Sequence, residues 1–157
     1  MAYVDINWDN NTSPRLFAKK VGVYEKSMRA GFRVPLLASR GILAKEIRTN
    51  FDVGGRPKWA KLSPKTTAKK TRNKTRPLIH TGRLRTSASA KERWHVSNNE
   101  AVFGDLPVTV HYGWAHIEGT FNMPARNWLN VPGDTVDVIG REIFDPWLGA
   151  KRTAAGL

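Results

Sequence analysis

The chain has 157 residues, enough for one domain with its own hydrophobic core and short for two. Lys and Arg number 26 against 13 Asp and Glu, a formal net charge of +13, and 40% of the residues are hydrophobic, which argues against disorder along the whole length. The absence of cysteine excludes disulfides, thiolate metal sites and a cysteine nucleophile, and no apolar run reaches the roughly 18 residues of a membrane helix.

Residues 13–51 have the pattern of two helices. Ser13 followed by Pro14 is typical of a helix start, because serine caps the first N–H groups and proline suits the first turn. Apolar residues then recur on one helical face, at Phe17, Val21, Tyr24 and Met28. A second helix is predicted over 35–50, with one apolar side made of Leu36, Leu43, Ile47 and Phe51, and it should end at the glycines of 52–55.

Positive charge is concentrated in the next segment. Residues 53–90 contain eleven Lys or Arg and no carboxylate, and three prolines interrupt the first part. We therefore predict that residues 52–77 form an extended basic arm, ordered mainly by a partner that carries phosphates or an acidic surface. A solvated loop that only keeps the protein soluble is the alternative. The candidate partner-binding residues are Lys58, Lys61, Lys65, Lys69, Lys70, Arg72, Lys74 and Arg76.

After the basic arm the pattern becomes one of short strands. Residues 78–132 are predicted as antiparallel strands, including 93–96 and 101–103 around a Ser-Asn-Asn turn. Alternating apolar residues predict a further half-buried strand over 108–114, with a bulge or a break near Gly113. A short C-terminal helix is expected over 133–149, limited by Pro146, with frayed residues after it. The prediction for residues 1–157 is a single α+β domain, with N-terminal helices packed on an antiparallel sheet.

The sequence offers no recognisable catalytic machinery. The most suggestive cluster is His111, His116 and Glu118, but in an unbroken strand His111 points away from the other two, so a metal site is disfavoured. No nucleophile elbow or phosphate-binding glycine loop is present. We expect a protein that is not an enzyme and that has no catalytic residues, no metal and no cofactor.

Three segments, in order, resemble a known family. They are residues 59–66, residues 78–87 and residues 114–129, which end in Pro-Ala-Arg-Asn-Trp-Leu. This set resembles the tailed-phage virion morphogenesis proteins of the Mu-type tail-completion group, which are similar to the HK97-type head–tail joining and neck proteins. The residues that match the motifs are expected to act structurally: Trp59, Leu62, Thr81, Gly82, Leu84, Gly119, Pro124, Ala125 and Arg126. Trp59 has two readings, stacking on a nucleic-acid base or, better supported, anchoring the basic arm to the core.

The resemblance implies a structural virion protein at the head–tail junction, a tail-completion, terminator or neck protein. Such proteins form rings, here a hexamer or dodecamer, and contact neighbouring neck, connector or tail-tube proteins, or DNA in the channel, but no membrane. The implied location is the virion, and the host cytoplasm during assembly. Trp8 and Trp147 lie outside the periodic segments and are candidate intersubunit contacts. The alternative, from charge alone, is a basic nucleic-acid-binding protein.

Overall fold

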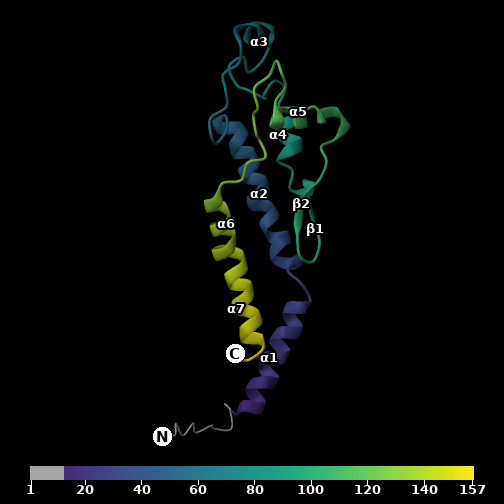
Figure 1. The fold of residues 1–157 in the computed structure, drawn as a ribbon, viewed down its shortest axis with the longest axis vertical. Helices are drawn as coiled ribbons and strands as arrows, with labels where there is room; N and C mark the ends of the chain where they lie inside the picture. Colours follow the sequence, from purple (N-terminus) through teal and green to yellow (C-terminus); the bar gives the residue numbers. More distant parts are fainter. Residues whose placement is uncertain (1–12) are drawn as a thin grey trace.

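A computed structural model describes residues 13–157 (Figure 1). The fold is α+β, as predicted, and the molecule is elongated. Helices α1 (Pro14–Arg29) and α2 (Arg33–Val53) run along the long axis, one after the other, with a bend between them at residues 30–32. The short helices α3 to α5 gather at the end of α2 that is far from α1.

Helix α1 begins as the sequence predicts. The Oγ of Ser13 accepts a hydrogen bond from the Leu16 amide at 3.4 Å, and Pro14 occupies the first turn. The predicted apolar face is only partly covered within the described chain, since Phe17 is 55% exposed and Val21 is exposed, whereas Tyr24 and Met28 are half-buried. Helix α1 packs instead beside α7 (Asp145–Ala154), at the end of the molecule where both termini of the described chain lie.

Helix α2 is the central helix of the domain. Its predicted apolar side is confirmed at Ile47 and Phe51, which are almost fully buried. Gly54 ends the helix in the left-handed conformation (φ +78°), as predicted, since glycine adopts this conformation without steric cost. The helix contacts α4 (Arg83–Ala88), α6 (Gly133–Ile139) and strand β1 (Trp94–Val96), so one helix holds the remaining elements together.

The core is rich in aromatic rings. Trp128 is fully buried, stacks with Phe51 at 6.2 Å between ring centroids, and meets Phe103 and Trp114 at tilted or edge-on angles. Its indole N–H donates to the carbonyl of Gly113 at 2.8 Å, so the polar end of the largest core side chain has a partner. Leu84 is also buried in this cluster. The core therefore lies around the second half of α2.

Only part of the predicted sheet is present. Strands β1 and β2 (Ala101–Phe103) pair antiparallel, with Trp94 opposite Phe103, which confirms the two short strands. Among the described residues they make one two-stranded sheet and, besides it, there is an isolated bridge between Thr120 and Met123. The prediction of strands throughout 78–132 is therefore wrong, because helical turns occupy much of that region.

The predicted strand over 108–114 is the clearest of these errors. The segment forms a 3₁₀ turn (Val108–Val110) and then helix α5 (Gly113–Glu118). The amides of Val110 and Trp114 donate to carbonyls three residues earlier, so the backbone needs no strand neighbour. Gly113 is not a bulge: a Cβ there would lie 2.5 Å from a Leu84 methyl, so the glycine permits close packing instead.

The C-terminal helical region is longer than predicted. Helix α6 continues through a π-helical turn (Gly140–Phe144) into α7, which ends at Ala154. Pro146 starts α7 instead of limiting the helix, because the first turn of a helix has no backbone bond for proline to remove. The expected fraying is also wrong at Ala155, which is buried.

Candidate interaction site

The basic arm is folded onto the domain and is not extended. Its middle forms the short helix α3 (Pro64–Lys69), which Ser63 caps by accepting a hydrogen bond from the Thr66 amide at 3.2 Å. Helix α3 lies at the tip of the molecule, beyond the end of α2 (Figure 1). At the start of the arm, Arg56 donates to the carboxylate of Glu46 at 2.7 Å and to the side chain of Asn50 at 2.8 Å.

Lys70 organises the second half of the basic arm. Its ammonium donates to three backbone carbonyls, of Asn73, Arg76 and Ile79, each at 2.7 Å. The side-chain amide of Asn73 also donates to the His80 carbonyl at 3.0 Å. Burial lowers the pKa of Lys70 from its ordinary value, because the charged form loses hydration. The expectation that a partner mainly orders this stretch is corrected, because hydrogen bonds within the chain, those of Lys70 among them, hold the arm.

The other predicted partner-binding cations face solvent. Arg76 forms an ion pair with Asp52 at 3.6 Å, and Lys58 donates to the Val53 carbonyl. No ion pair within the described residues 13–157 involves any other of these cations. The exposed members are Lys58, Lys61, Lys65, Lys69, Arg72, Lys74 and Arg76. One end of the molecule thus presents a dense positive surface, as the sequence predicts.

The family-motif residues tie the basic arm to the core. Trp59 donates its indole N–H to the Asn127 carbonyl at 3.2 Å and meets Phe51 edge-on at 5.7 Å, which supports the anchor reading and disfavours base stacking. Gly119 has φ +78°, and a Cβ there would lie 2.7 Å from the Ala125 amide nitrogen, so only glycine fits. Gly82 also has positive φ, before buried Leu84. Three motif residues are exposed: Thr81, Pro124 and Ala125.

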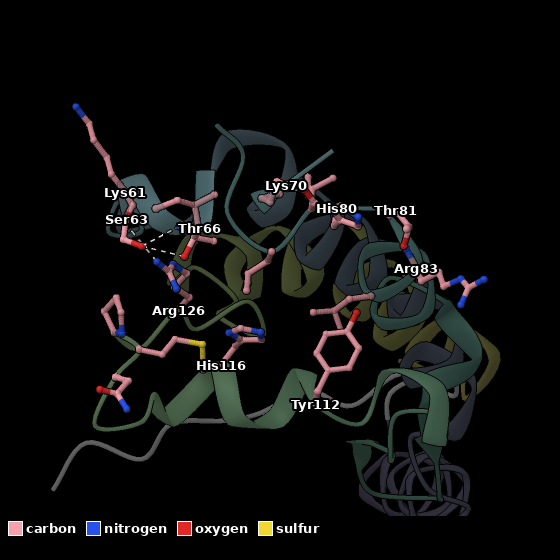
Figure 2. A pocket seen from close by; sticks show the side chains of 18 residues that line it. Lys61, Ser63, Thr66, Lys70, His80, Thr81, Arg83, Tyr112, His116 and Arg126 are labelled. Carbon is pink, nitrogen blue, oxygen red and sulfur yellow. Dashed lines mark hydrogen bonds between the residues drawn. The ribbon is translucent and has the colours of Figure 1, made fainter. Parts of the chain in front are cut away.

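A cleft of about 550 Å³ lies between the basic arm, the segment 78–84, helix α5 and the loop 122–126. Figure 2 shows His116 and Tyr112 beside each other on one side of the cleft, with Arg126 next to His116, and Lys70, His80 and Thr81 on the opposite side. Within residues 13–157, no carboxylate lines this cleft. Its apolar lining comes from Leu62, Leu78, Ile79, Leu84, Met123 and Pro124. The lining of the cleft therefore combines apolar side chains with cationic and neutral polar ones.

Arg126 is the most unusual residue of the cleft. Its side chain is only 5% exposed, yet no carboxylate of the described chain pairs with it. Its guanidinium donates to the backbone carbonyls of Ala60 (3.2 and 3.3 Å) and Lys61 (3.5 Å), which join the basic arm to the loop 122–126. Burial lowers the pKa of Arg126. Buried arginines are normally paired with an acid, so the cleft holds a positive charge without a counter-charge.

His116 lies next to this charge. Burial, and then the positive charge of Arg126, lower the pKa of His116, so the imidazole is neutral at neutral pH. Its Nδ1 is enclosed and has no hydrogen-bond partner among residues 13–157. His111 is exposed, and within the described part of the chain no group of three His, Asp or Glu side chains is placed to hold a metal ion.

Of the two candidate intersubunit tryptophans, the structure describes one. Trp8 lies outside the described residues. Trp147 is half-buried, with its ring 5.5 Å from that of Phe32 and 5.6 Å from the ammonium of Lys151. It therefore joins α7 to the bend after α1, and its intersubunit role stays a prediction.

The cleft itself was not predicted from sequence. Its parts come from four segments that are up to 65 residues apart, such as Lys61 and Arg126. The sequence feature that points to the cleft is Arg126 in the Pro-Ala-Arg motif, because an arginine next to apolar core residues requires polar partners. Sequence reasoning assigned the binding role to the exposed cations of the arm instead.

Comparison with known proteins gives one informative similarity. The Mu-like prophage FluMu G protein 2 of Haemophilus influenzae is 34% identical to this chain over 113 residues, which cover 68% of this chain and 73% of that protein. No family model matches the chain, and no solved structure matches it. No helix in residues 13–157 is long and apolar enough to cross a membrane.

Proposed function

The chain belongs to the family of the Mu-like prophage G protein 2, and from this premise we propose that it is a structural protein at the head–tail junction of a phage particle. In this role it forms a ring, a hexamer or dodecamer, that closes the tail or joins it to the head. It works by binding its neighbours, without catalytic turnover. Its site of action is the virion, after assembly in the host cytoplasm.

The proposal is supported by family membership together with the exposed cations at one end of the molecule. The basic arm that carries the exposed cations is held in place, since hydrogen bonds of Lys70, Arg126 and Trp59 attach it to the rest of the domain. A rigid basic surface attracts acidic neighbouring proteins, or DNA in a channel, with little ordering cost on binding. The elongated subunit suits head-to-tail contacts that close into a ring (Figure 1).

The decisive experiment removes the protein from the phage that encodes it. A stop codon early in the reading frame should give lysates in which electron micrographs show unjoined tails beside filled, tailless heads. Supplying the intact chain from a plasmid should restore joined particles. Normal infectious particles in the absence of the chain would refute the structural role.

A nucleic-acid-binding protein is the second candidate, supported by the net charge of +13. The packing of Trp59 against Phe51 removes the base-stacking platform that would strengthen it. Binding of the purified chain to a duplex DNA fragment at several salt concentrations separates the two. Tight binding with a steep salt slope favours the DNA role, whereas weak binding together with rings in micrographs favours the structural role.

A further inference from the structure

We propose that the cationic cleft receives residues 1–12 of a neighbouring copy of the same chain, so that each subunit holds the next by its N-terminal segment. This inference deepens the proposed ring function and rests on it. The cleft is the concave space between the basic arm, residues 78–84, α5 and the loop 122–126. Its occupant is identified by three properties of the molecule: charge, apolar pattern and reach.

The first property is charge. Arg126 is buried, and among residues 13–157 no carboxylate pairs with it and no acid lines the cleft. Residues 1–12 contain two of the 13 carboxylates, Asp5 and Asp9, and none of the 26 Lys and Arg. The described residues 13–157 thus carry 11 acids against 26 cations. Residues 1–12 are therefore an acidic segment on a strongly basic chain, and two basic bodies need such a segment to attract each other.

The second property is the apolar pattern. In residues 1–12 the side chains of Val4, Ile6 and Trp8 alternate with polar or acidic ones, including Asp5 and Asp9. An extended peptide with this alternation directs apolar side chains to one face and carboxylates to the other. The lining of the cleft offers both kinds of partner, apolar side chains and cationic ones. The aromatic Trp8 is suited to such a lining, since tryptophan anchors many interfaces.

The third property is reach, which decides between the same subunit and a neighbour. Helices α1 and α2 have 16 and 21 residues, a contour of about 55 Å of helix, and they follow one another along the long axis, while the segments that line the cleft lie at the far end of α2. Twelve fully extended residues span about 40 Å at most. The segment is therefore too short to fill its own cleft, so the proposed cleft is that of an adjacent subunit. A contact of this kind is head-to-tail, and repeated by a constant rotation it closes a ring.

The first test uses disulfide trapping in the full chain, which contains no cysteine of its own. One chain carries Asn7→Cys and another, labelled with ¹⁵N, carries Asn122→Cys, an exposed position on the cleft. Mixed and oxidised, they should give a linked pair of one light and one heavy chain. The matched control places the second cysteine at Val136→Cys, which is 61% exposed on α6 and outside the cleft.

The proposal is supported if the yield of light–heavy pairs with Asn122→Cys is well above the yield with the Val136→Cys control. Adding Asp5→Asn and Asp9→Asn should abolish this excess. Equal linking in the two pairs overturns the proposal. A chain that carries both Asn7→Cys and Asn122→Cys gives a further check. Closure of the disulfide within one monomer would show that the segment binds its own subunit, which also overturns the proposal.

The second test measures the interaction directly. A fluorescent peptide of residues 1–12 with blocked ends is titrated with the full chain bearing Asp5→Asn and Asp9→Asn, whose own segments compete poorly. The peptide with both aspartates replaced by Asn should bind about tenfold more weakly, and added salt should weaken the acidic peptide. Arg83→Gln, on the cleft, should weaken binding, whereas Arg141→Gln, on the π-helical turn, should not. Equal affinity of the two peptides refutes the proposal.

The two proposals fail in different ways. Rings in micrographs of the wild-type chain, without linking at Asn122→Cys, leave the head–tail function in place and overturn the segment exchange. Normal infectious phage without the chain refute the head–tail function itself, whatever the linking shows.

Discussion

The support that Lys70 gives to the basic arm can be tested by removing its ammonium. In Lys70→Met the carbonyls of Asn73, Arg76 and Ile79 lose their shared donor while the aliphatic stem is kept. Two of these bonds are exposed and one is partly buried, so water replaces much of what is lost. A net contribution of about 0.5–1 kcal/mol for each bond gives a local loss of about 1.5–3 kcal/mol.

The assay is amide hydrogen exchange, because the loss affects opening of the arm more than unfolding of the whole domain. The Arg76 amide donates to the Asn73 carbonyl inside the loop that Lys70 closes. It should exchange about 10- to 100-fold faster in Lys70→Met, since about 1.4 kcal/mol corresponds to a factor of ten. Lys69→Met, at the exposed end of α3, is the matched control and should leave this rate unchanged. Unchanged exchange in Lys70→Met would refute the internal support of the arm.

Three further predictions concern stability, each measured by chemical denaturation. Folding lowers the pKa of His116, so the unfolded chain binds protons more readily, and the free energy of unfolding should fall as the pH drops below about 6.5. His116→Gln should lose this pH dependence, whereas His111→Gln, at an exposed position, should keep it. Gly119→Ala should cost about 2–4 kcal/mol, from positive φ and a backbone clash, whereas Gly149→Ala, with open space in α7, should add about 0.5–1 kcal/mol. Trp128→Phe should cost about 2–4 kcal/mol, since the Gly113 carbonyl loses its donor and the core gains a void. A free energy of unfolding that does not change with pH would contradict the burial of His116. A Gly119→Ala or Trp128→Phe variant as stable as the parent would contradict the tight packing at that position.

The error over residues 108–114 shows how local pattern and tertiary context compete. Apolar residues at 108, 110, 112 and 114 satisfy the period of a strand, but Val108 is 94% exposed while Val110 is buried. Backbone turns use the same residues, and no strand of the described chain lies in position to pair with them. A strand needs a neighbour, and a single segment of sequence does not reveal whether one exists.

The segment that resembles a family illustrates the opposite case. Gly119 and Trp59 have roles that follow from their residue types, one at a left-handed backbone position and one as an anchor. The resemblance itself rested on the order of three segments, and the identity to a Mu-like prophage protein supports it at the level of the phage family. The place in the particle and the ring are proposals that the experiments above test.

Local chemistry determined the features that need only neighbours in sequence. Ser13 and Pro14 start a helix, Gly54 ends one, and the run of cations without acids makes one end of the molecule basic. Tertiary structure alone decided that Lys70 folds the arm back and that Arg126 is buried with no acidic partner in the described part of the chain. Both outcomes depend on contacts between segments distant in the chain, and such contacts are set by packing around the aromatic core rather than by any local pattern.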